Sequence, residues 1–300
     1  MALPEDVPVV PLRHWGRWVS GVVILALLVG LGSAMADAQI LYEDVPGFFS
    51  ADVMIDGLVN TVVLAVVAQA AAVVLGVVVA LMRRSANPVA RWVAWVYIWI
   101  FRGVPVLLQI LLWYNLALVF KTISVPIPFT DAHLIDTPTN ALITAFVAAL
   151  LGLGLNESAY MAEIVRAGLN SVDPGQLEAA KAIGMTPATT LRRVVLPQAM
   201  RVIIPPTGND FINMLKGTSM ASVIGFLELI HAANNISSRN LEIMETLLAA
   251  AAWYMIVVSV ASVGQYYLER AFGAADRVDR GLTPWSRVAR SFRTPPTVRS

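Results

Sequence analysis

Four polar side chains interrupt an otherwise apolar stretch, Val202–Ile230, late in the sequence. Asn209, Asn213 and Lys216 are spaced i, i+4 and i+7, so a helix would place them on one face, with Asp210 one position round. Within a membrane segment such ionisable groups are costly, and they are functional candidates by default. The residue types and their spacing indicate a pathway for a small polar molecule.

The same residues also have a structural explanation. Polar side chains can hold membrane helices together, and Asp210 and Lys216 could form an internal pair. Pro205 and Pro206 stand just before the group and predict a broken helix, with freed backbone groups near the pathway. Further polar candidates for this pathway are Glu157, Thr218 and Asn60.

Other polar residues indicate little enzyme chemistry. Glu163 and Arg166 are expected to form an ion pair or a gate rather than to bind a molecule directly. The histidines, His14, His133 and His231, are scattered without the spacing of metal ligands, so no metal site is predicted. No H-E-x-x-H or G-x-S-x-G motif occurs, so no catalytic residue is predicted.

The composition predicts the elements that position these residues. The chain of 300 residues is 57% hydrophobic and 14% charged, with a mean hydropathy of +0.69, whereas soluble domains average about 45–50% and about 25%. A soluble fold must meet water with its outer face, so hydrocarbon is the expected solvent here. The formal net charge of +1 points to no partner, and without cysteine there are no disulfides or thiolate sites.

The expected fold is all-α, a polytopic bundle of about six transmembrane helices. A bilayer core about 30 Å thick needs about 20 apolar residues per helix. Uninterrupted candidates are Trp18–Ala36, Gly57–Met82, Val104–Phe120 and Leu247–Leu268. Interrupted candidates are Ala141–Leu155 with the polar residues after it, and Val202–Ile230.

The basic residues orient these spans. Most Lys and Arg lie near the start, in segments 83–102 and 161–201, and in the tail after Leu268, whereas segment 37–56 has five acids and no base. The excess of positive charge in cytoplasmic loops predicts that both termini are cytoplasmic. Segments 37–56, 121–140 and 231–246 should then lie outside. Arg13, Arg17 and Ala34-Met35-Ala36 also resemble a cleavable signal peptide, although an uncleaved first helix is favoured because its apolar run is long.

The cytoplasmic segment of about 161–201 is too long for a simple connector. Asp173-Pro174 predicts a helix start and Gly184 its end. Thr186-Pro187 predicts a second short helix, which Pro197 would end near Leu196. This segment fits three interpretations: a DNA reader, which is disfavoured between two spans, a solvated helical loop, and a rigid lever that docks on a soluble partner. The lever is favoured.

Motifs in this segment resemble a known family. Glu178-Ala179-Ala180, Gly184 and Leu196-Pro197 are similar to the E-A-A-x(3)-G-x(9)-I-x-L-P loop of bacterial ATP-binding-cassette (ABC) importer permeases, with Val194 at the isoleucine position. Additional segments resemble the polar amino-acid permeases of the histidine, glutamine and arginine type: Phe101-Arg102-Gly103-Val104-Pro105 with Gln109, the run from Ala159-Tyr160 to Gly175-Gln176, and the run from Asn209 to Glu228-Leu229.

The resemblance implies an assembly and a division of the chain. It implies two permeases, identical or paralogous, in the bacterial inner membrane. It also implies an ATPase dimer and a soluble solute-binding protein as partners. The chain lacks a G-x(4)-G-K-[ST] loop, so ATP and Mg²⁺ are expected on the partner and no cofactor on this chain. Residues 1–54 would form an N-terminal segment with the first helix, 55–270 a five-helix permease domain, and 271–300 an Arg-rich cytoplasmic tail attracted to lipid.

The resemblance also implies a mechanism. The coupling residues would be Glu178, Ala179, Ala180, Gly184, Leu196 and Pro197. A zwitterionic amino acid needs acceptors for its ammonium, such as Asp210 and Glu157, and donors for its carboxylate, such as Asn213, Lys216 or Thr218. The alternatives are the same architecture with an opine or organic cation as cargo, and a stand-alone ion-coupled carrier or channel. No nucleic-acid partner and no enzyme activity of this chain are expected.

Overall fold

A computed structural model describes residues 15–127, 129–130 and 133–272. The chain divides into two compact units. One contains the helix α1 (Trp15–Ala36), and the other contains the remaining described elements from residue 41 onward. Predictions about residues 1–14 and most of the Arg-rich tail lie outside the described residues.

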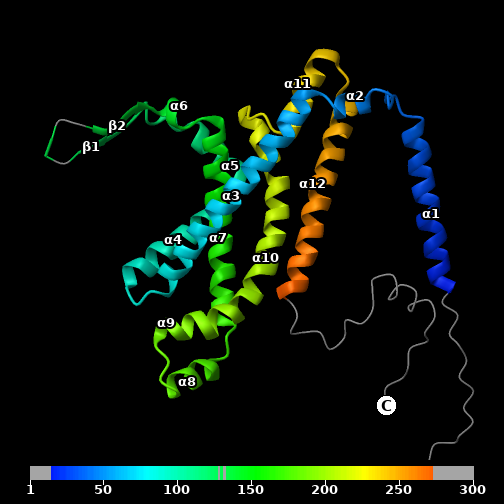
Figure 1. Cartoon of the computed structure of the whole chain (residues 1–300). Helices are drawn as coiled ribbons and strands as arrows, with labels where there is room; N and C mark the ends of the chain where they lie inside the picture. Colours follow the sequence, from blue (N-terminus) through cyan, green and yellow to red (C-terminus); the bar gives the residue numbers. More distant parts are fainter. Residues whose placement is uncertain (1–14, 128, 131–132, 273–300) are drawn as a thin grey trace, which may run out of the picture. The chain divides into compact units, whose positions relative to one another are not determined.

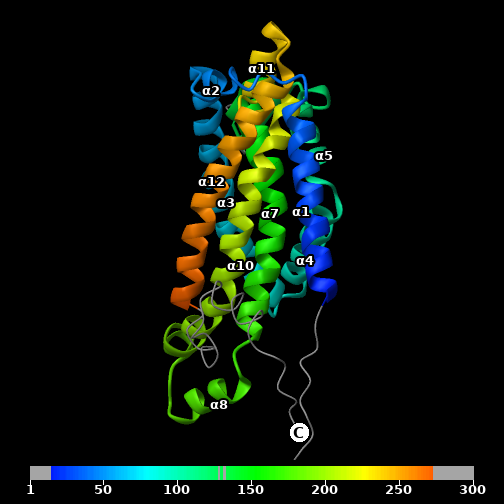
Figure 2. The same ribbon diagram turned by 90° about the vertical axis from the view of Figure 1, so that its right-hand side faces the viewer.

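The second unit is almost entirely helical (Figure 1). Its long helices are α3 (Asp52–Arg84), α4 (Pro88–Gly103), α5 (Val106–Tyr114), α7 (Ala145–Asn170), α10 (Leu196–Gly217), α11 (Leu229–Asn240) and α12 (Ile243–Phe272). Shorter elements are α2 (Val45–Phe49), η1 (Leu116–Leu118), α6 (Thr139–Leu142), α8 (Pro174–Ala182), α9 (Pro187–Thr190), η2 (Leu191–Val195) and η3 (Thr218–Ile224). In both views α8 lies at one end of this unit and α11 at the opposite end (Figures 1 and 2).

The structure confirms a helical membrane bundle. Among the described residues, α1, α3, α7 and α12 are long and apolar enough to cross a membrane, and α4 with α5 adds a fifth span if the bent pair counts as one. The more polar α10, of 22 residues, lies against α7 and α12. The predicted five-helix core therefore corresponds to α3, the bent pair, α7, α10 and α12.

Small residues bring these helices close together. A Cβ atom at Gly152 of α7 would lie 2.9 Å from the backbone nitrogen of Ile110 in α5. One at Gly76 of α3 would lie 2.5 Å from the Cβ of Met161 in α7. Because lipid gives helices no hydrophobic reason to associate, such close packing is a main source of attraction between them. α7 is thus packed closely against both neighbours.

The third predicted span differs from the expectation of one helix at Val104–Phe120. α4 and α5 meet at an angle of 101°. The Nε2 of Gln109 donates to the carbonyl oxygens of Phe101 and Val104, at 3.0 and 2.8 Å, and the Nδ2 of Asn156 donates to Phe101 at 2.6 Å. These donors satisfy carbonyls that the break leaves free, so the chain can bend inside the bundle.

The two proline predictions are wrong. Pro197 does not end the second short helix: it stands in the first turn of α10, where a proline is tolerated, and the π-helical η2 leads directly into it. Pro205 and Pro206 lie inside a continuous α10. There the Nε2 of Gln265 donates to the Pro205 carbonyl at 2.7 Å, so a neighbouring helix supplies a hydrogen bond beside the prolines.

The predicted span Val202–Ile230 also ends early. α10 stops at Gly217 and is followed by η3, a turn with Gly225 at φ +76°, and α11. An unpredicted antiparallel hairpin, β1 (Thr122–Pro126) with β2 (His133–Pro138), follows α5 and η1 (Figure 1).

Candidate functional site

The first candidate site is the α8 segment. Asp173 caps α8, its side chain accepting from the Gly175 N–H at 2.6 Å, as predicted. Glu178 and Ala179 are exposed, whereas Ala180 is buried. Ile183, just past the helix end, is 78% exposed although it is apolar. A short helix with so little of its surface packed on its own chain is suited to contact with another protein.

Gly184 ends α8 in the left-handed conformation, with φ +76°. The Met185 N–H donates to the Ala180 carbonyl at 3.0 Å, and the Gly184 N–H donates to Lys181 at 3.0 Å. This is the closing pattern of a helix that ends on glycine, and a residue with a Cβ would be strained there. The predicted stop at Gly184 is therefore confirmed.

The α8 segment is joined to α10 by helical turns. Thr186 caps α9, and α9, η2 and α10 then follow one another without a gap. Leu196 and Pro197 are exposed at the start of α10. A displacement of this segment therefore has a helical route into the membrane part of the chain.

The second candidate site is the exposed face of α10. Asn209, Asn213 and Lys216 are all exposed and share one face, as their spacing predicts. Lys216 does not pair with Asp210, so the alternative of an internal pair does not hold in this structure. Thr218 is fully buried and its hydroxyl donates to the Leu215 carbonyl at 2.8 Å, so it does not reach this face.

Asp210 instead lies close to Glu157 of α7, so that the two carboxyl groups interact electrostatically. The Glu157 Oε1 is buried and has no hydrogen-bond partner among the described residues. Two carboxyl groups placed side by side repel each other when both are charged, unless a proton or a cation accompanies them. The structure thus brings together the two acids that the sequence assigned to ammonium binding.

Three other predicted residues have defined contacts. The Arg166 guanidinium forms an ion pair with Glu163 at 2.6 Å, one turn apart on α7. Asn60 does not line the exposed α10 face: its Nδ2 donates to the Leu227 carbonyl at 2.8 Å. Asn60 therefore holds the turn before α11.

Arg102 and Tyr160 form a contact that the sequence interpretation missed. The guanidinium carbon of Arg102, the residue before the end of α4, lies 4.9 Å from the centroid of the Tyr160 ring on α7. The charge pattern predicts Arg102 in a basic loop, but it lies beside the break in the bent pair. The sequence signal that could have identified Arg102 is the motif Phe101-Arg102-Gly103-Val104-Pro105 that contains it.

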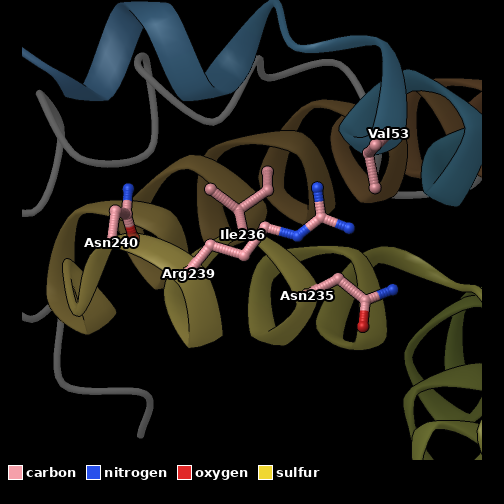
Figure 3. A pocket seen from close by; sticks show the side chains of 5 residues that line it. All are labelled: Val53, Asn235, Ile236, Arg239 and Asn240. Atoms are coloured by element: carbon pink, nitrogen blue, oxygen red, sulfur yellow. The ribbon is translucent and has the colours of Figure 1, made fainter.

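A cleft opens at the α11 end (Figure 3). Its volume is about 260 Å³, with apolar Val53 and Ile236 and the polar side chains of Asn235, Arg239 and Asn240 around it.

Comparisons with known proteins identify the family. Residues 72–273 match the family described as binding-protein-dependent transport system inner membrane component. The chain is 42% identical to the arginine transport system permease protein ArgU of Corynebacterium glutamicum, covering 90% of this chain and 84% of ArgU. It is 40% identical to the probable amino-acid permease protein YxeN of Bacillus subtilis, covering 73% and 90%.

A solved structure described as an amino acid ABC transporter with histidines is 38% identical, with a TM-score of 0.62, covering 73% of this chain and 94% of that one. The chain therefore belongs to the binding-protein-dependent transport system inner membrane components. It is a multi-pass membrane permease subunit, as the motifs around Glu178 predicted.

Proposed function

We propose that the chain is the permease of an ATP-driven importer of polar amino acids. The amino-acid cargo is supported by the names of the relatives and of the similar solved structure. The proposed partners are an ABC ATPase dimer, a second permease and a soluble solute-binding protein. ATP and Mg²⁺ would bind to the ATPase rather than to this chain. The alternative cargo for the same architecture is an opine or organic cation.

The observation that carries this proposal is the exposed, capped helix α8. Its start at Asp173 and its end at Gly184 are fixed by local hydrogen bonds, so it can behave as a rigid piece. Glu178 on its exposed surface would contact the ATPase. When the ATPases close on ATP, the motion would pass through α9 and η2 into α10, which carries the polar face.

The exposed face of α10 supports the second part of the proposal. Asn209, Asn213 and Lys216 cannot face hydrocarbon without a large cost. A second permease would cover this face and leave a polar pathway at the interface between subunits. Asp210 and Glu157 would then bind the ammonium group of the cargo.

The proposed orientation places α8 in the cytoplasm. The α11 end, with the cleft at Arg239, would face the solute-binding protein outside. This arrangement follows from the distribution of basic residues and puts both termini in the cytoplasm. Glu163 and Arg166 would form an ion pair near the cytoplasmic end of the pathway.

Glu178→Arg tests the proposal. Reversal of charge on the exposed face of α8 should strongly reduce co-purification of the ATPase and abolish uptake, while the permease stays folded. Glu242→Arg makes the same charge change at a partly exposed position beyond α11, and it should leave recovery of the ATPase unchanged. Normal ATPase recovery and uptake with Glu178→Arg would contradict the docking role, and uptake without ATP would favour an ion-coupled carrier.

A further inference from the structure

The helix α4 turns a stripe of tryptophans away from the rest of its unit. Trp92, Trp95 and Trp99 are spaced i, i+3 and i+7, so they lie along one face of the helix. Their exposed fractions are 65%, 47% and 65%, whereas Ala94 and Ile98 on the opposite face are buried. The face that carries these three tryptophans, the α4 stripe, is therefore open to the surroundings of the protein.

The indole rings of the α4 stripe are ordered, but their N–H groups are unused. The Trp95 and Trp99 rings stack, with centroids 6.2 Å apart and planes 3° apart. Among the residues that the structure describes, no side chain or carbonyl accepts a hydrogen bond from the indole nitrogens of the stripe. Tryptophan combines an apolar ring with a donor that seeks an acceptor, which is why it gathers where a membrane meets water. An acceptor for the stripe has to come from outside this chain.

Basic side chains stand beside the α4 stripe, and no acid balances them. Arg83 and Arg84 end α3, Arg91 lies near the start of α4, and segment 83–102 contains no Asp or Glu. Arg91 precedes Trp95 by four residues, so the two side chains share a face. Neither the Arg83 nor the Arg91 guanidinium has a hydrogen bond or an ion pair within the described part of the chain. Two unpaired cations beside exposed indoles favour an anionic, partly apolar ligand.

Arg84 fixes the place of this basic group in the fold. Its Nη1 donates to the Asn170 Oδ1 at 2.5 Å. Asn170 is the last residue of α7, and α8 begins shortly after it at Pro174. The span formed by α3 also ends at Arg84. The basic group therefore lies where the chain leaves the hydrocarbon on the α8 side, at the depth of lipid headgroups.

We infer that the α4 stripe, together with Arg83 and Arg91, binds an anionic phospholipid of the leaflet on the α8 side. The guanidiniums would bind the phosphate, whose oxygens accept paired hydrogen bonds from arginine. The indole rings would lie against the upper acyl chains, with their N–H groups donating to the ester oxygens. A phospholipid supplies the negative charge, the acceptors and the apolar surface together. The site uses none of the residues assigned to the cargo or to the ATPase.

The test is native mass spectrometry of the full-length chain, purified in detergent with the subunits that accompany it. The protein is titrated separately with phosphatidylglycerol and with phosphatidylcholine of the same acyl chains, which has a phosphate but no net charge. The wild type should bind phosphatidylglycerol more tightly. Arg83→Gln combined with Arg91→Gln should weaken phosphatidylglycerol binding roughly ten- to thirtyfold, the loss expected for two basic residues at an anionic surface. Phosphatidylcholine binding should stay within about twofold.

Matched variants separate charge, ring and fold. Lys121→Gln combined with Arg239→Gln removes the same number of charges at exposed positions on the predicted outer side, and it should bind both lipids as the wild type does. Trp95→Leu combined with Trp99→Leu should weaken both lipids alike, because both contain the parts that the rings contact. If the variant without Arg83 and Arg91 does not fold, a higher salt concentration on the wild type should weaken phosphatidylglycerol binding alone.

A cysteine reporter distinguishes lipid from a second copy of the chain. The sequence contains no cysteine, so Val89→Cys, three residues before Trp92 and 66% exposed, is a single thiol. It should stay monomeric when membranes are oxidised. Efficient disulfide dimers would show that a second copy covers the α4 stripe and would overturn the inference. Equal binding of the two lipids by the wild type, or unchanged phosphatidylglycerol binding after removal of both arginines, would overturn it as well.

Discussion

The two ends of the helical unit are stabilised in different ways. At one end α8 is exposed, and residues next to it in the sequence cap it: Asp173 bonds Gly175, and Gly184 closes the last turn. At the other end the start of α11 is buried and held from distant helices. Glu228, fully buried, accepts from the N–H groups of Ile230 and His231 at 3.0 and 2.8 Å and from the Tyr254 hydroxyl at 2.8 Å.

α3 adds to this second end. Its Asn60 donates to the Leu227 carbonyl, and Thr61 accepts from the Leu229 N–H at 3.2 Å. The turn before α11 is therefore tied to both α3 and α12. The comparison teaches that α8 can move as a small rigid piece, whereas the α11 end can move only together with the long helices. Motion driven by a partner would enter at α8.

The largest expected effect is the loss of Glu228. Glu228→Ala leaves the first N–H groups of α11 and the Tyr254 hydroxyl without their acceptor in a buried site. We expect a loss of about 3 kcal/mol in stability, seen as a lower Tm of the purified permease. Glu228→Gln keeps one acceptor oxygen and should lose less. An unchanged Tm for Glu228→Ala would show that the α11 end does not depend on this tertiary contact.

The next effect is at Gly184. Gly184→Val forces a β-branched residue into φ +76° and should cost about 1–3 kcal/mol locally. Because α8 carries little of the packing, we expect the Tm of the permease to change little and ATPase co-purification to fall severalfold. Gly264→Ala is the control, because a Cβ there meets nothing within 4 Å. A large drop in Tm for Gly184→Val would contradict the independence of the α8 segment.

The smallest effect is at Asp173. Asp173→Ala removes the N-cap of α8, which typically costs about 1 kcal/mol. The helix should fray from its first turn, giving a modest loss of ATPase recovery with no change in Tm. Asp173→Asn, which keeps an acceptor oxygen, should restore recovery. Equal recovery for Asp173→Ala and the wild type would show that the partner itself orders this turn.

The difference between local contacts at α8 and long-range contacts at α11 also explains which features could be predicted from the sequence. The bounds of α8 were predicted because Asp173, Pro174 and Gly184 act on adjacent backbone. The single face of Asn209, Asn213 and Lys216 was predicted because spacing alone determines it. Sequence spacing could not reveal that Gln265 would bond beside Pro205, so a helix break was predicted where none exists.

Other features depend on contacts across the fold. Thr218 was assigned to the pathway, but the end of α10 turns it inward. The charge pattern places Arg102 in a basic loop. The break beside it depends on Gln109 and Asn156, whose contacts with the Phe101 carbonyl cannot be seen in the sequence. The β-hairpin after η1 was not predicted, because charge and position indicate only an outside loop for segment 121–140.

The π-helical turn η2 has a consequence for engineering and for evolution. The Leu196 N–H donates five residues back, to Leu191, instead of four. One residue is thereby accommodated beyond the ordinary α-helical count, and each residue rotates a helix by about 100°. Deleting a single residue from 191–195 would turn Asn209, Asn213 and Lys216 by that angle relative to α8. A deletion of one codon would thus change the orientation of the polar face of α10 relative to α8, while each helix stays folded.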